Sequence, residues 1–233
     1  MNNPTNHPTG DQPSVLASLR ALLPNRRLQL FEAMRLAELQ ANRLLEMSRV
    51  EEIPVPIEII TDMPHIQLEY EADMPASGAS DWDSHHQTWV ITVNSLEPET
   101  RQRLSILHEY KHIIDHGSPG LVDDPSGRTY YGLSRHEFLA EYFAGCVLMP
   151  RRWVKRAWSD GIQYVPDLAE LFDVSRRAMQ VRLGQLRLSG SQDTYRRAKS
   201  ILPQRYVRAP WTAYYRRTLP LRLQPIPVKE TAT

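Results

Sequence analysis

Two histidines four residues apart, with a glutamate directly after the first, are the residues of this sequence best suited to chemistry. They lie in His108-Glu-Tyr-Lys-His112, an HExxH pattern within a run that we expect to be helical. Residues i and i+4 share one helix face, so the two imidazoles can converge on one ion. Imidazole is a good ligand for Zn²⁺ in a tetrahedral site. Glu109 projects about 100° around the helix from His108, so it can act as general base toward a water that the metal activates. The alternative is a solvated helix face that carries two histidines.

A catalytic zinc ion takes three protein ligands and keeps one position open for water. His116 continues the four-residue spacing, but it lies about 12 Å from His108 along the helix axis, too far for one ion. The longer pattern HExxHxxGxxH is broken at Asp115 and Ser118, which excludes the metzincin arrangement. The third ligand must therefore come from another element, and the next expected helix offers Glu137.

Glu137 and Glu141 are also four residues apart, in a helix expected to begin after Ser134 and to stop before Pro150. One carboxylate can bind the metal while the other supports a ligand histidine through a hydrogen bond. Ser134 and Glu137 also match a capping box, S-x-x-E, in which the glutamate bonds to the backbone instead. Spacing alone leaves both interpretations open.

These segments resemble the ImmA/IrrE family of zinc metallopeptidases. The resemblance rests on the HExxH helix followed by Glu137-Phe-Leu-Ala-Glu-Tyr-Phe-Ala-Gly-Cys-Val-Leu-Met-Pro150, and also on 89–94 and 101–108. It covers about residues 25–190 and is most specific at 104–150. The resemblance implies a zincin-like domain in which His108, His112 and Glu137 bind Zn²⁺ and Glu109 is the general base. Two residues depart from the family pattern: Lys111 stands where Gly is common, and Glu141 stands where Asn is frequent.

The resemblance also implies a zinc endopeptidase whose protein substrate is a helix-turn-helix repressor of a mobile element or a stress response. The alternative is a DNA-binding or protein-binding regulator whose zincin-like domain is structural. A peptidase further needs a group that stabilises the oxyanion. The sequence does not choose among six candidates: His85, His86, Tyr130, Tyr131, His136 and Tyr142.

Residues 166–187 predict two short helices, 166–172 and 176–186, joined by a turn at Asp173-Val174, as in a helix-turn-helix. Ser175 is expected to cap the second helix. The apolar residues expected in its core are Leu168, Ala169, Phe172, Val174, Met179 and Leu183. The side chains expected to reach phosphates, base edges or a substrate are Arg176, Arg177 and Gln180, with Arg182 as a further candidate. The alternative is an αα-hairpin packed on the peptidase domain.

The net charge of +1 hides an uneven distribution. Residues 1–150 hold 11 basic and 21 acidic side chains, whereas residues 151–233 hold 17 basic and 6 acidic ones. The basic part is suited to an anionic partner or to the acidic part itself.

The longest apolar run, 143–149, is too short to span a membrane. The lone Cys146 excludes an internal disulfide, and no signal peptide is recognisable, so we expect a cytoplasmic protein without a membrane partner.

The spacing of apolar residues along the chain predicts an α+β fold. We expect a mainly helical zincin-like domain with a small β-sheet, followed by a helix-turn-helix segment. The expected domains are a disordered tail at 1–12, the zincin-like domain at 13–158, the helix-turn-helix segment at 159–202 and a basic, Pro-rich tail at 203–233. The expected helices are 14–23, 25–49, 98–116, 135–148 and 151–158. Strands are expected at 66–70 and 89–93, with an extended region from Ile59 and a loop at 76–80.

Overall fold

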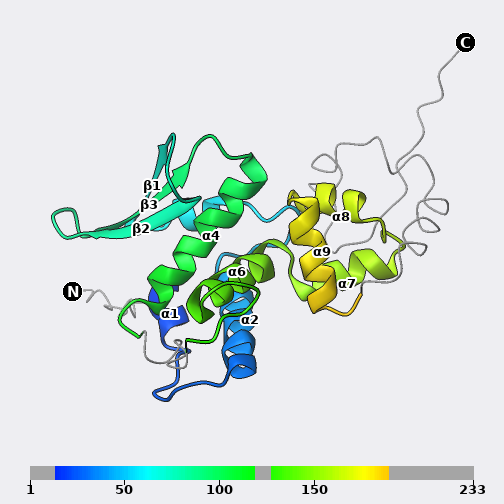
Figure 1. Cartoon of the computed structure of the whole chain (residues 1–233), viewed down its shortest axis with the longest axis horizontal. Helices are drawn as coiled ribbons and strands as arrows, with labels where there is room; N and C mark the ends of the chain where they lie inside the picture. Colours follow the sequence, from blue (N-terminus) through cyan, green and yellow to red (C-terminus); the bar gives the residue numbers. More distant parts are fainter. Residues whose placement is uncertain (1–13, 119–126, 189–233) are drawn as a thin grey trace, which may run out of the picture.

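The computed structural model of this chain describes residues 14–118 and 127–188. Its elements confirm the predicted α+β class, with helices packed on one side of a small sheet (Figure 1). In chain order they are α1 (Val15–Arg20), α2 (Leu30–Met47), α3 (Glu58–Thr61), β1 (Ile66–Glu71), β2 (Gly78–Asp83), β3 (Thr88–Asn94), α4 (Glu99–Asp115), α6 (Arg135–Leu148), α7 (Arg151–Ser159), α8 (Val165–Phe172) and α9 (Arg176–Gln185). The expectations for 1–12, 189–202 and 203–233 lie outside the described residues.

The sheet has the strand order β1-β3-β2. β1 runs parallel to β3 and β2 runs antiparallel to it. Along β3, alternate side chains are buried, at Trp89, Ile91 and Val93, as expected for a strand with one face on the core. Helix α4 packs against β2 and β3, so the sheet covers one side of this helix. The predicted strands at 66–70 and 89–93 are confirmed.

Three local predictions were wrong. Residues 78–83 form an edge strand where the sequence predicted the end of a loop, because pairing with β3 compensates for the low strand propensity of Gly, Ser and Asp. Ile60 lies in a one-turn helix, α3, where an extended region was expected, and its side chain is fully buried. Helix α2 begins at Leu30 instead of after Asn25, because Gln29 and Glu32 form a capping box there.

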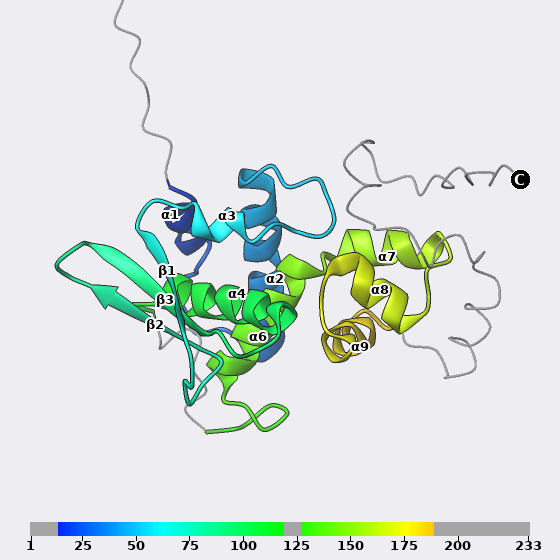
Figure 2. The same ribbon diagram turned by 90° about the horizontal axis from the view of Figure 1, so that it is seen from above.

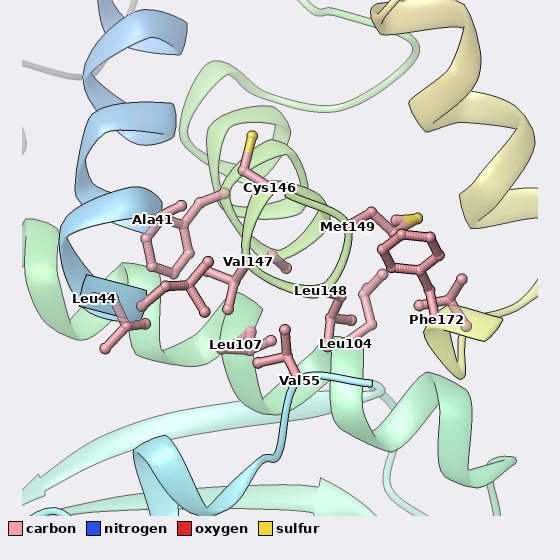
Figure 3. Close-up of a cluster of buried hydrophobic side chains, with 14 of the residues drawn as sticks. Ala41, Leu44, Val55, Leu104, Leu107, Cys146, Val147, Leu148, Met149 and Phe172 are labelled. Atoms are coloured by element: carbon pink, nitrogen blue, oxygen red, sulfur yellow. The ribbon is translucent and has the colours of Figure 1, made fainter. Parts of the chain in front are cut away.

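Helix α6 packs against both α2 and α4 (Figure 2). It begins after Ser134, whose Oγ accepts a hydrogen bond from the Glu137 backbone N–H at 3.5 Å, and it ends before Pro150 as predicted. Figure 3 shows side chains from all three helices in one cluster, including Ala41 of α2, Leu107 of α4 and Val147 of α6. This packing holds α4 and α6 against each other.

The two helices and the turn predicted within 166–187 are confirmed as α8 and α9. Asp173 adopts the left-handed conformation with φ 50°, and the Ser175 Oγ accepts a hydrogen bond from Ala178 N–H at 3.1 Å. All six residues predicted for the core of this hairpin are buried. They belong to the same hydrophobic cluster as α4 and α6, and Figure 3 shows Phe172 of α8 in the same group of side chains as Met149.

Arg182 corrects one prediction for this segment. It was expected to be exposed on α9, but only 1 % of its surface is accessible. Its Nε donates a hydrogen bond to the Met149 carbonyl oxygen at 2.9 Å. This bond connects α9 to the end of α6. A guanidinium buried in this way contacts other parts of the same protein and is not accessible to a nucleic acid.

Within residues 14–118 and 127–188, no helix is both long enough and apolar enough to cross a membrane.

Candidate metal centre

Two packed helices bring together the residues that the sequence predicted as metal ligands. His108 and His112 lie one turn apart on α4, and Glu137 lies in the first turn of α6. The opposite face of α4 carries Leu107 and Ile113, both fully buried, which fixes the rotation of the helix about its axis. The two imidazoles therefore face the start of α6.

Three potential ligand side chains converge on one point. The Nε2 atoms of His108 and His112 are 3.0 Å apart, and His108 Nε2 is 3.0 Å from Glu137 Oε2. His112 Nε2 is 3.5 Å from Glu137 Oε1. Ligand atoms bound tetrahedrally to Zn²⁺ at about 2.0–2.1 Å are about 3.3 Å from one another. The spacing and the two-imidazole, one-carboxylate donor set therefore fit a zinc ion.

The position of Glu137 separates the two interpretations that its sequence left open. Its backbone N–H is capped by Ser134, while its carboxylate is turned toward the two histidines. The glutamate therefore contributes to the start of α6 through its main chain and keeps its side chain available as a ligand.

The electrostatics of His112 favour metal binding. Burial, reinforced by the neighbouring His108, lowers the pKa of His112 to about 4. The imidazole is consequently neutral at pH 7, and the neutral form is the one with a lone pair for a metal.

Glu109 occupies a different position from Glu137. A carboxylate oxygen of Glu109 and a ring nitrogen of each of the two histidines lie within 4.8 Å of one another. The side chain is buried, and its Oε2 accepts a hydrogen bond from the Ser80 hydroxyl at 3.0 Å. Burial raises the pKa of Glu109, while the imidazole of His108 and the bond from Ser80 oppose the shift. A carboxylate with a raised pKa beside the ligands is suited to accept a proton.

A cleft of about 390 Å³ opens at these residues, between α4, α6 and the start of β2. Besides the three candidate ligands and Glu109, its lining includes Gly78 and Leu104. It therefore has both the candidate ligands and an apolar surface that a substrate can contact.

Glu141 has a different partner from the one predicted. Its Oε1 accepts a hydrogen bond from Arg101 Nη1 at 3.2 Å, where support of a ligand histidine was expected. One helical turn beyond Glu137, the carboxylate faces the first turn of α4, where Arg101 lies, so it bridges α6 and α4 at the end of the cleft. Lys111, the other departure from the family pattern, is buried, and its ammonium pairs with Asp115 one turn along the same helix.

Of the six candidates for oxyanion stabilisation, His136 is beside the ligand cluster. Its Nε2 is 3.4 Å from Glu137 Oε1, and its ring centroid is 5.8 Å from that of His112. The other five have contacts elsewhere: His85 and His86 in the turn after β2, Tyr130 and Tyr131 against Phe138, and Tyr142 near Glu38.

Arg176, Arg177 and Gln180 are exposed on α9, as predicted, and they are not part of the cleft. Sequence reasoning missed Gly78 and Ser80, which contact Glu109 from β2. The only signal was the run of small residues at 76–80, which sequence analysis interpreted as a loop.

The sequence model of the Peptidase M78 family, the IrrE N-terminal-like domain, matches residues 65–184, which is just over half of the chain. The chain therefore belongs to this family. Family membership supports a role as a metallopeptidase or as a regulator, and the cluster of His108, Glu109 and His112 is a possible metal site.

No curated protein matches the chain. A solved structure of a Mycobacterium tuberculosis transcriptional regulator is similar to it, with 20 % identity and a TM-score of 0.48. The match covers 74 % of this chain and 52 % of that protein, so the chain spans about half the length of the regulator.

Proposed function

We propose that this protein is a zinc-dependent endopeptidase that cleaves a DNA-binding transcriptional repressor of helix-turn-helix type. The observation that carries the proposal is the convergence of His108, His112 and Glu137 within 3.0–3.5 Å, with Glu109 beside them in the same cleft. Cleavage of a repressor would switch transcription of a mobile element or of a stress response, and such a substrate would place the protein in the cytoplasm.

In this proposal, His108, His112 and Glu137 hold the ion, and each other residue of the centre has a separate task. Bound Zn²⁺ would supply a Lewis acid that polarises the scissile carbonyl and lowers the pKa of water. Glu109 takes the proton of the attacking water and later donates it to the leaving amine. His136 donates a hydrogen bond to the oxyanion.

The edge of the sheet supports an extended polypeptide as substrate. In the described part of the chain, β2 pairs with β3 on one side only, and its first residue lines the cleft. The N–H and C=O groups of an unpaired strand edge can bind an extended peptide as an added strand. A flexible linker in a repressor provides such a segment, whereas a folded domain does not.

The test combines metal analysis with cleavage. Wild-type protein is expected to contain one zinc ion, and His112→Ala is expected to lose it. Glu109→Gln is expected to keep the zinc and to lose about 10²–10⁴-fold in the rate of repressor cleavage. Glu99→Gln, an exchange at the start of the same helix, is the matched control and should leave both unchanged. A folded wild-type protein that binds no metal would contradict the proposal.

The α8–α9 hairpin supports a second candidate, a regulator that binds DNA or protein. Arg176, Arg177 and Gln180 are exposed at the start of α9, where a helix can contact phosphates and base edges. In this hypothesis, duplex DNA binds residues 166–187 with an affinity that falls steeply with salt, and Arg177→Ala reduces that dependence. Absence of duplex binding at low salt would remove the DNA version of this candidate.

A further inference from the structure

We propose that Ser80 and Gly78 of the edge strand β2 are positioning residues for Glu109, and this inference rests on the peptidase function proposed above. Glu109 lies on α4, but two residues of the sheet lie against its side chain. These are Ser80, which donates a hydrogen bond to the carboxylate, and Gly78. The strand would therefore fix where the general base stands relative to the metal ligands.

Ser80 holds one oxygen of the carboxylate. Its Oγ donates a hydrogen bond to Glu109 Oε2 at 3.0 Å, between a half-buried hydroxyl and a buried carboxylate. A hydrogen bond to a charged acceptor in a partly dry site is stronger than one between neutral groups. The bond selects one orientation of the side chain and leaves Oε1 for the proton transfer.

Gly78 makes room for the rest of the side chain. A Cβ atom at this position would lie 3.1 Å from Glu109 Cγ and 3.3 Å from Glu109 Oε1. Both distances are shorter than ordinary contacts between such atoms, so any larger residue would push the carboxylate away. The close approach of the glutamate, and not the backbone conformation, favours glycine here, since the φ of Gly78 is not in the left-handed region.

The register of the sheet holds both residues in place. Residues 78 and 80 point to the same face of the strand. Gly78 is paired with Val93 and Ser80 with Ile91, both of which have no accessible surface. A shift of β2 by one residue would turn both away from Glu109 and would also disrupt the pairing with a buried strand. The position of Glu109 thus depends on the core through β3 and β2.

Kinetics on zinc-loaded enzyme test the inference. Ser80→Ala is expected to lower kcat for repressor cleavage about 10-fold with KM unchanged, because a base displaced by a fraction of an ångström transfers its proton poorly. Ser80→Thr keeps the hydroxyl and is expected to restore most of kcat. Gly78→Ala is expected to lower kcat by about 10–100-fold. Thr88→Ala, which removes from the neighbouring strand a half-buried hydroxyl that donates to the His86 carbonyl oxygen, is the matched control.

A second measurement does not depend on catalysis. In metal-free protein, Ser80→Ala is expected to lower the unfolding midpoint in the wild-type background and to lower it less in a Glu109→Ala background. If Ser80→Ala shifted the unfolding midpoint equally in the two backgrounds, the contact between Ser80 and Glu109 would contribute nothing to stability. That result would overturn the inference. Zinc content should be unchanged in every Ser80 and Gly78 variant, because neither residue contacts the candidate ligands.

The outcomes separate this inference from the function on which it rests. If wild-type protein binds zinc but cleaves no repressor, the proposed function fails, and the inference fails with it. If Glu109→Gln is inactive while Ser80→Ala cleaves as fast as wild type, only the inference is overturned. Loss of kcat in Ser80→Thr equal to that in Ser80→Ala would also overturn it, since a structural defect at position 80 would then explain both.

Discussion

Among the six oxyanion candidates, His136 is the one whose imidazole lies next to the candidate metal ligands Glu137 and His112. Because an oxyanion forms beside the ion, a donor must lie at the ligand cluster to stabilise it. We expect His136→Ala to lower kcat for repressor cleavage by about 10²-fold without loss of zinc. His85→Ala, in the exposed turn after β2, should leave kcat unchanged. Equal activity of the two variants would exclude His136 from this role.

The relative position of two candidate residues could be predicted where one helix sets it. The HExxH spacing places both imidazoles on one face whatever the rest of the fold, so His108 and His112 could be paired from the sequence alone. Glu137 needed the family resemblance, since its spacing also matches a capping box. The partner of Glu141 could not be predicted, because Arg101 reaches it from another helix. Ser80 could not be predicted either, since its contact depends on the register of the sheet.

Glu38 of α2 connects helices that are far apart in the sequence. Its carboxylate accepts hydrogen bonds from Arg151 of α7, at 2.7 Å from Nε and 2.8 Å from Nη2. The buried Arg182 of α9 lies 3.7 Å from the same carboxylate. The hydrogen bonds from Arg151 hold the pKa of Glu38 below its ordinary value of 4.5. The charged form of Glu38 therefore stabilises the contact of α7 and α9 with α2.

This arrangement predicts a pH-dependent stability. A carboxyl whose pKa is lowered on folding contributes its stabilisation above pH 4.5 and loses it as the pH falls through the lowered value. We expect Arg151→Met to lower the free energy of unfolding by about 1 kcal/mol at pH 7, a modest figure because the Arg151 side chain is partly exposed. Denaturant unfolding at pH 7 and at pH values below the carboxyl range measures the difference, which should shrink in acid.

The control for this prediction lies one turn away. Lys155→Met removes an exposed positive charge from the same helix without removing a partner of Glu38, so its effect should be small at both pH values. A loss of stability in Arg151→Met that is the same at neutral and acid pH would contradict the ionic origin of the effect.

The starts of three helices could be predicted because serine caps are local, whereas the start of α2 was missed. Ser14, Ser134 and Ser175 each accept a hydrogen bond from the backbone three residues later, as their positions in the sequence predicted. Strand β2 and helix α3 could not be predicted, because each forms through non-local contacts: β2 by pairing with β3, and α3 by burying Ile60 in the core. The elements that sequence analysis missed are thus those with little propensity of their own.

The hydrophobic core crosses the boundary that the sequence suggested between the zincin-like domain at 13–158 and the segment at 159–202. One cluster of buried side chains includes residues from α1 to α9 and continues just past the end of α9. Phe172 of α8 has no accessible surface and belongs to the cluster that contains Met149 and Leu104. The charged network at Glu38 crosses the same boundary. Although the division into two domains stays a prediction, the shared core leads us to expect that both parts unfold together.

A single substitution tests this cooperativity. Phe172→Ala is expected to lower the free energy of unfolding by about 3–5 kcal/mol, since it removes a fully buried aromatic ring and leaves a cavity. Because the ring shares a hydrophobic cluster with Leu104, which lines the cleft at the candidate metal centre, zinc release and loss of helical circular dichroism should occur in one transition. Val181→Ala, at a position of α9 that is 52 % exposed, should change stability by less than about 0.5 kcal/mol. If helical signal is lost in Phe172→Ala while the zinc centre persists, residues 159–202 fold as a separate unit and the shared core does not couple them.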